Sequence, residues 1–154
     1  MTGVEIIEAS PNESGIVSEL VFALLRELEP GAEGEISEMD LPSITGELLS
    51  RGKIIAFIAR SGEENIGVIT LHECAAIYAG GLFGEISELY VAPAHRSRDV
   101  GGRLVKAALL RGRELGWKRL EVGTPPPGEW PKTTNFYLRN HFKATGARLR
   151  RLIP

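Results

Sequence analysis

The segment 88–104 combines residue types that can hold a phosphate group. An apolar strand there runs into a tight turn and then opens a helix, whose free N–H groups and positive dipole end can bind an anion. Two adjacent glycines, Gly101 and Gly102, let the backbone approach a ligand without an intervening Cβ. Charge-assisted bonds to phosphate can come from three arginines: Arg96, Arg98 and Arg103. The segment predicts a phosphate-binding turn, with a solvated basic turn before an ordinary amphipathic helix as the alternative.

The apolar pattern of the rest of the chain predicts the elements that position this turn. Strands are expected over residues 4–9, 54–59, 66–78, 83–91 and 119–123, with a final hairpin over 142–145 and 147–152. Helices are expected over residues 10–28, 40–49, 100–115 and 132–140. Within strand 83–91, Ile86, Glu88 and Tyr90 are expected on one face because side chains alternate along a strand. The element order predicts a mixed α/β sheet.

Size and composition fit one globular domain spanning residues 1–154. The chain is 43% hydrophobic, which is ordinary for a globular protein. Its formal net charge of −2 gives no long-range attraction to nucleic acid or anionic membranes. Cys74 is the single cysteine, which excludes an intrachain disulfide and fits a reducing cytosol. The N-terminal residues lack the pattern of a signal peptide, and no apolar run approaches the roughly 20 residues of a membrane span. We therefore expect a cytoplasmic protein.

Two motifs in this order resemble the GCN5-related N-acetyltransferase (GNAT) family. In the family's first motif, Arg96, Val100 and Gly101 occupy their expected places, whereas Asp99 replaces a glycine and Ser97 stands where glycine is frequent. Residues 135–142 resemble the second motif, in which a Phe-Tyr pair is usually followed, after three residues, by Gly-Phe. In this chain His141 replaces that glycine. The resemblance covers about residues 54–152 and implies a mixed, mainly antiparallel central sheet flanked by helices.

The resemblance implies acetyl-CoA as co-substrate and an amine as acceptor, either a small molecule or a peptide. Pantetheine would pair like an added strand with the backbone of Leu89, Tyr90 and Val91, and Asn135 would bond it or an adjacent water. The pyrophosphate would bind the segment made of Arg96, Ser97, Arg98, Asp99, Val100, Gly101 and Gly102. No nucleic acid or membrane partner is expected, and a homodimer is compatible with the family.

Acetyl transfer requires a neutral amine, yet a lysine-like amine has a pKa of about 10.4. Glu88, on the strand before the turn, is the best placed base, acting directly or through water. The alternative is a sheet glutamate paired with a basic neighbour. Tyr137 matches the family's usual general acid, which would protonate the departing thiolate. Core packing is the alternative for Tyr137.

Several residues are assigned no catalytic or metal-binding role. Cys74 is expected in the core, and the three histidines lack metal-ligand spacing, so no metal is predicted: His72, His95 and His141. The loop 125–134, with Trp130, either borders the acceptor pocket or is a stiff connection. Two rival functions remain: a non-catalytic acyl-CoA-binding or sensing domain, which Asp99 favours, and a nucleotide-binding α/β domain. The antiparallel strand pairs argue against the second rival, since βαβ units need crossovers there.

Overall fold

The computed structural model describes residues 3–125, 128–146 and 148–154. The chain divides into two compact units, Met1–Glu121 and Val122–Pro154. The first unit contains most of the sheet and the predicted phosphate-binding turn, and the second contains the predicted general acid. That the whole chain forms one domain stays a prediction.

The sheet has the strand order β1-β2-β3-β4-β5. Its strands are β1 (Val4–Glu8), β2 (Ile55–Ser61), β3 (Glu64–Ala76), β4 (Gly81–Val91) and β5 (Leu120–Val122). The first four strands pair in antiparallel fashion, each with the next along the chain. A mixed α/β fold with a mainly antiparallel sheet is therefore confirmed, and the strand boundaries lie within about two residues of the predicted ones.

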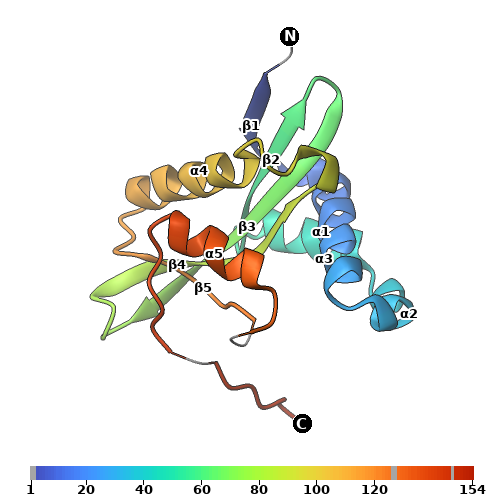
Figure 1. Ribbon diagram of the computed structural model, residues 1–154. Helices are drawn as coiled ribbons and strands as arrows, with labels where there is room; N and C mark the ends of the chain where they lie inside the picture. Colours follow the sequence, from blue (N-terminus) through green and yellow to red (C-terminus); the bar gives the residue numbers. More distant parts are fainter. Residues whose placement is uncertain (1–2, 126–127, 147) are drawn as a thin grey trace. The chain divides into compact units, whose positions relative to one another are not determined.

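Helices cover both faces of this sheet (Figure 1). One face packs against α1 (Ser14–Leu28) and α3 (Leu41–Ser50), with Val17 and Leu20 of α1 in one buried cluster with Ile58 and Val68. The other face is covered by α4 (Val100–Glu114). A Cβ at Gly67 of β3 would lie 3.3 Å from Leu104 of α4 and 2.9 Å from a backbone oxygen, so glycine lets helix and sheet approach closely. The short helix α2 (Glu33–Glu38) was not predicted.

Trp117 fills a slot between β4 and α4. Its indole ring occupies the space that a Cβ would need at Gly84 of β4 and at Gly112 of α4. The indole Nε1 donates a hydrogen bond of 2.8 Å to Glu73 Oε1 on β3. The ring is therefore held by close packing against Gly84 and Gly112 and by the hydrogen bond of its Nε1 to Glu73.

The second unit contains α5 (Pro131–Arg139), at the predicted place. The predicted final hairpin is wrong: residues 142–146 and 148–154 form no strand, while residue 147 lies outside the described residues. Leu149 is 95% exposed and Ile153 is 92% exposed. The alternating apolar residues of this segment therefore have no buried face to pack against. An isolated hairpin without a buried face is only marginally stable in water. Among the described residues, no helix has the length and apolar character needed to cross a membrane.

Candidate functional site

A β-bulge near the end of β4 decides where Glu88 points. Leu71 of β3 pairs with Ile86, and the preceding residue Thr70 pairs with Glu88, so Ser87 is an extra residue in β4. Because Thr70 and Leu71 point to opposite faces, Ile86 and Glu88 do too. The expectation that Ile86, Glu88 and Tyr90 share one face is therefore wrong for Ile86. The bulge places Glu88 on the sheet face that α1 covers.

Thr70 holds Glu88 through two hydrogen bonds. The Glu88 backbone N–H donates to Thr70 Oγ1 at 3.0 Å, and the Thr70 hydroxyl donates to Glu88 Oε1. Thr70 is buried, whereas Glu88 is partly accessible. The alternative prediction was that Glu88 pairs with a basic neighbour. The hydrogen bonds that the structure shows for Glu88 are with Thr70 instead. The carboxylate keeps a second oxygen, Oε2, beyond its bond to Thr70.

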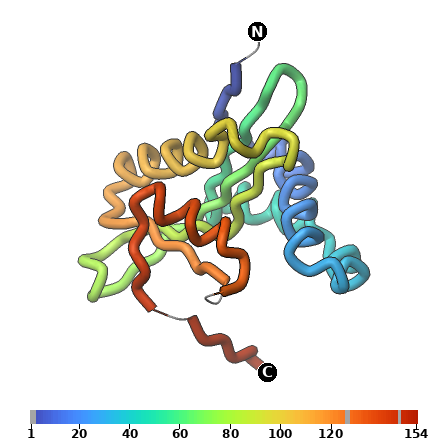
Figure 2. Tube along the Cα trace, in the orientation of Figure 1, coloured from blue at the N-terminus to red at the C-terminus, as the bar shows by residue number. Residues whose placement is uncertain are grey.

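The chain passes from β4 through a 3₁₀ turn, η3 (Pro93–His95), into α4 (Figure 2). Ser97 has φ 77° and Asp99 has φ 58°, so both adopt the left-handed conformation that glycine adopts at lowest cost. These are the two positions at which the resemblance led us to expect glycine. The turn therefore keeps a glycine-type backbone with non-glycine residues. Asp is among the residues that best tolerate this conformation.

The guanidinium of Arg96 is bonded to other residues of this chain. Its Nη1 and Nη2 donate to the two carboxylate oxygens of Glu27 at 2.9 and 2.7 Å, and Nε donates to the Val91 carbonyl at 2.8 Å. The guanidinium carbon also lies 5.7 Å from the centre of the Tyr90 ring. The hydrogen bonds to Glu27 raise the pKa of Arg96. Arg96 thus joins α1 to the turn, and phosphate would have to share this guanidinium with Glu27.

Asp99 occupies the N-cap position of α4, but within the described part of the chain its side chain forms no capping hydrogen bond. Among the described residues, no backbone N–H at this helix start bonds to its carboxylate. The carboxylate instead lies over Gly102, where Oδ1 takes the space of a Cβ. Val100 beside it is buried, whereas Arg98 and Arg103 are exposed. A negative charge therefore stands over the first turn of the helix, with exposed cations nearby in sequence.

The predicted pantetheine segment is the last part of β4. Leu89, Tyr90 and Val91 pair across the ladder with Ile69, Val68 and Gly67 of β3. Their side chains are half-buried, and Tyr90 packs against the core cluster beside α1. The hydrogen bonds that join β4 to the segment leading into β5 lie at its other end, from Lys118 to Leu82 and from Gly84 to Arg119.

Within the second unit, Tyr137 is 6% exposed and packs edge-on against two rings. The Phe136 and Phe142 ring centres lie 5.2 and 5.3 Å from its own. Burial raises the pKa of Tyr137 to about 12, so the phenol stays protonated at neutral pH. Asn135, two residues earlier in the chain, is exposed. His141, at the place of a family glycine, again has a positive φ of 71°.

The family profile described as "Acetyltransferase (GNAT) domain" matches residues 52–144. The chain belongs to the GNAT acetyltransferase family. No curated protein matches it in sequence.

Solved structures with the same GNAT fold share little sequence with this chain. An aminoglycoside acetyltransferase from an uncultured soil metagenomic sample superposes with TM-score 0.83 at 20% identity, covering 99% of both chains. A GNAT protein from Ralstonia eutropha gives 0.81 at 18% identity, covering 97% of this chain and 99% of the other. An aminoglycoside N-acetyltransferase in complex with CoA gives 0.74 at 19% identity, covering 99% and 96%. At these identities the likeness shows the fold.

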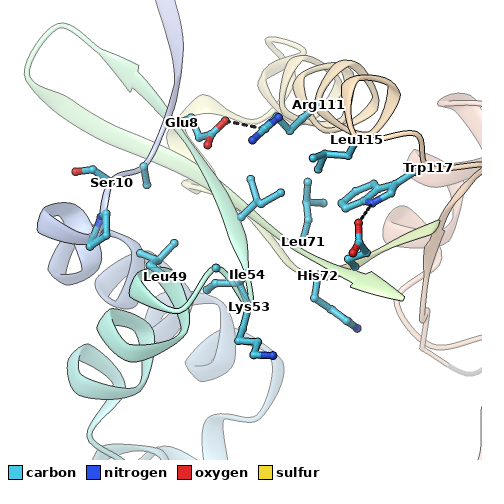
Figure 3. Close-up of a pocket in the computed structure, with 15 residues that line it drawn as sticks. Glu8, Ser10, Leu49, Lys53, Ile54, Leu71, His72, Arg111, Leu115 and Trp117 are labelled. Atoms are coloured by element: carbon cyan, nitrogen blue, oxygen red, sulfur yellow. Dashed lines mark hydrogen bonds and ion pairs between the residues drawn. The ribbon is translucent and has the colours of Figure 1, made fainter. Parts of the chain in front are cut away.

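The GNAT fold also contains a cavity of 580 Å³ away from the predicted phosphate-binding turn (Figure 3). Its walls come from residues 8–11, 49, 52–55 and 71–73 and from the end of α4 with the residues after it. Arg111 Nε lies 3.2 Å from Glu8 Oε1 across one end. Arg111 is eleven residues after Val100, roughly 16 Å along the helix axis. The cavity therefore lies at the opposite end of α4 from the predicted phosphate site.

Three residues that sequence reasoning missed contact or position the predicted site residues Glu88 and Arg96. Thr70 bonds Glu88, Ser87 forms the bulge, and Glu27 holds Arg96. A threonine inside the apolar run 66–71 of β3 is a signal that could have pointed to Thr70. Glu27 carries no such signal, because 69 residues separate it from Arg96.

Proposed function

We propose that this GNAT protein is an N-acetyltransferase that moves an acetyl group from acetyl-CoA to an amine. The observation that carries the proposal is the turn between β4 and α4. Its residues Ser97 and Asp99 have the left-handed backbone that glycine adopts at lowest cost, and the turn opens a helix of fifteen residues. A helix N-terminus of this kind suits the pyrophosphate of CoA. The acetyl-CoA donor itself is carried over from the family.

In this proposal the thioester lies beside the end of β4. The backbone of Leu89, Tyr90 and Val91 would pair with the pantetheine amides, and Asn135 would bond pantetheine or a neighbouring water. A backbone N–H at this position would polarise the thioester carbonyl and make its carbon more electrophilic. These contacts use main chain, so their strength depends on the bulge and the turn more than on side-chain identity.

The proposed base is Glu88. The amine nitrogen attacks the thioester carbon, and its proton passes to the carboxylate directly or through water. The two hydrogen bonds with Thr70 support this role. One holds the backbone of Glu88, and the other holds carboxylate oxygen Oε1 while leaving Oε2 for the incoming proton. The carbon–sulfur bond then breaks, and the sulfur leaves with the electron pair.

The proposed acid is Tyr137, which gives its proton to that sulfur. Burial favours this role in one respect and opposes it in another. The raised pKa keeps the phenol protonated throughout the neutral range. It also makes full transfer to a thiolate, with an ordinary pKa near 8.5, unfavourable by several pKa units. Transfer concerted with carbon–sulfur cleavage would avoid a free phenolate.

The rival is a non-catalytic acyl-CoA-binding or sensing domain, and one observation favours it. The carboxylate of Asp99 lies over the helix start where pyrophosphate would bind. The carboxylate would repel the pyrophosphate, and the hydrogen bonds of Arg96 to Glu27 compete with bonds to phosphate. Both features predict weak binding of acetyl-CoA. Binding without turnover over a broad panel of amines would favour the rival.

The deciding experiment measures CoA release from acetyl-CoA with a panel of amines. The panel contains aminoglycosides and peptides with N-terminal alanine, because similarly folded proteins bear the names aminoglycoside acetyltransferase and ribosomal-protein-alanine N-acetyltransferase. Small polyamines and lysine peptides complete it. Cys74 is a thiol outside any intrachain disulfide, so reactions without acetyl-CoA correct for its reaction with the thiol reagent. Acceptor-dependent release, with the acetylated product seen by mass spectrometry, supports the proposal. Release equal to that without acceptor contradicts it.

A further inference from the structure

Three side chains with metal-binding atoms meet across β3 and β4, next to the bulge. His72 and Cys74 are two residues apart on β3 and therefore point to the same face. Glu85 of β4 is the direct cross-strand partner of His72. One imidazole nitrogen, the thiol sulfur and one carboxylate oxygen all lie within 4.8 Å of one another, and all three residues are half-buried. Sequence spacing could not reveal this group, because its third member comes from another strand.

Ser87 sets the orientation of the His72 ring. Its Oγ lies 2.9 Å from His72 Nδ1, while His72 Nε2 lies 3.2 Å from Glu85 Oε2. A metal-binding histidine commonly bonds through one nitrogen to a fixing group and binds the ion through the other. Two nitrogen or oxygen ligands about 2.0 Å from a tetrahedral zinc ion lie about 3.3 Å apart. The separation of Nε2 and Oε2 already fits this geometry.

We propose that His72, Cys74 and Glu85 form a binding site for one zinc ion, with water in the fourth position. Imidazole, thiolate and carboxylate are the ligand types that zinc uses, and a thiolate disfavours magnesium and calcium. Cys74 closes the site by rotating its side chain toward the other two atoms. The ion replaces the direct His72–Glu85 contact, so the two groups bind metal where they would otherwise bind each other. The zinc proposal does not rest on the proposed acetyl transfer, although Ser87 takes part in both sites: its hydroxyl contacts His72, and its backbone forms the bulge beside Glu88.

The test uses Co²⁺, whose spectrum reports both ligand type and geometry. Reduced, chelator-treated protein is titrated with Co²⁺, and Zn²⁺ is then added as competitor. Cys74 is the only cysteine of the chain, so a sulfur-to-cobalt charge-transfer band can come only from it. We expect that band, intense visible bands of a tetrahedral ion, one equivalent per chain, and displacement by Zn²⁺. Zinc should also raise the thermal midpoint, because it binds the folded state.

Variants separate the site from unspecific binding. Cys74→Ser should abolish the charge-transfer band, and either Cys74→Ser or Glu85→Gln should lower Zn²⁺ affinity at least about 100-fold, since even the loss of an outer hydrogen-bond partner costs about 10- to 100-fold. Ser87→Ala should cost about 10-fold. His95→Asn is the matched control, because His95 also faces a glutamate, with Nε2 3.5 Å from Glu64, but outside this cluster. A missing charge-transfer band, a stoichiometry of one half, or equal losses in His95→Asn would overturn the proposal.

Discussion

The carboxylate of Asp99 lies over Gly102, so a negative charge stands above the first turn of α4. We expect Asp99→Asn to strengthen acetyl-CoA binding, because it removes that charge and keeps a polar side chain. Two like charges about 4 Å apart cost about 1 kcal/mol in water-like surroundings and about 4 kcal/mol near a protein surface. The gain should be about 5-fold or more by titration calorimetry. Asp99→Gly should also gain affinity. If both variants bind equally or more weakly, Asp99 does not oppose the cofactor.

Arg96→Ala should weaken acetyl-CoA binding by about 10-fold, if its guanidinium contributes a charged hydrogen bond to phosphate. Because Arg96 also binds Glu27, the same variant loosens α1 from the turn. Glu27→Gln separates the two effects: it weakens the contact with α1 while keeping the guanidinium. Calorimetry should show unchanged or tighter binding for Glu27→Gln. Equal losses in the two variants would instead assign Arg96 a purely positioning role.

Glu88→Gln should lower turnover most at low pH, where most of the amine is protonated and a base is most needed. Glutamine keeps the shape of the side chain and can still accept the hydrogen bond from Thr70. Initial rates across the pH range, at saturating acetyl-CoA, measure the effect. A profile that overlays wild type would make Glu88 structural.

Tyr137→Phe should lower kcat by about 100-fold or more with little change in acetyl-CoA affinity, as expected for the loss of a general acid. The rings of Phe136 and Phe142 already surround this position, so phenylalanine should pack without strain. Stopped-flow turnover and calorimetry together provide the test. Wild-type turnover would mean that Tyr137 only packs.

The raised pKa of Tyr137 also predicts a pH dependence of stability. The folded value is about 12 and the unfolded value about 10, so the neutral phenol favours the folded state. This contribution is fully present below pH 10 and is lost as the pH rises through 12. Its size is about 3 kcal/mol. Urea unfolding at pH 9 and 11 should show about half of this loss in wild type, because pH 11 lies midway between the two pKa values. The loss should be absent in Tyr137→Phe.

His141→Gly should stabilise the protein by about 1 kcal/mol, because position 141 has a positive φ that costs a non-glycine residue. Arg139→Gly, at the end of α5, is the matched control. It should lose about 1 kcal/mol, because glycine is unfavourable within a helix. Denaturant unfolding measures both. A loss of stability in His141→Gly would mean that the imidazole has contacts worth more than the backbone cost.

Local patterns predicted the parts of the site that depend on local structure. The strand before the turn, the start of α4 at Val100 and the helix that carries Tyr137 all follow from apolar periodicity and the two motifs. The bulge at Ser87 could not be predicted from β4 alone, because it arises from pairing with β3. Contacts between distant segments, such as Glu27 with Arg96 or His72 with Glu85, depend on the assembled sheet.

The same limit explains the errors. Residues 142–152 have the alternation of a hairpin, yet Leu149 points into solvent. Alternation predicts a strand when one face has something to pack against, and sequence alone does not show whether it does. The conformation of Asp99 is a further feature that its residue type does not show: Asp99 is the N-cap residue of α4, but its left-handed backbone places the carboxylate over Gly102.

The slot that holds Trp117 ties three positions together in evolution. Any side chain at Gly84 or Gly112 would collide with the indole, so neither glycine can be replaced while the tryptophan stays in place. A smaller residue at 117 would leave a void, which a larger residue at 84 or 112 could then fill. We therefore expect these three positions to covary among relatives. A relative with a smaller residue at 117 should have a larger residue at 84 or at 112.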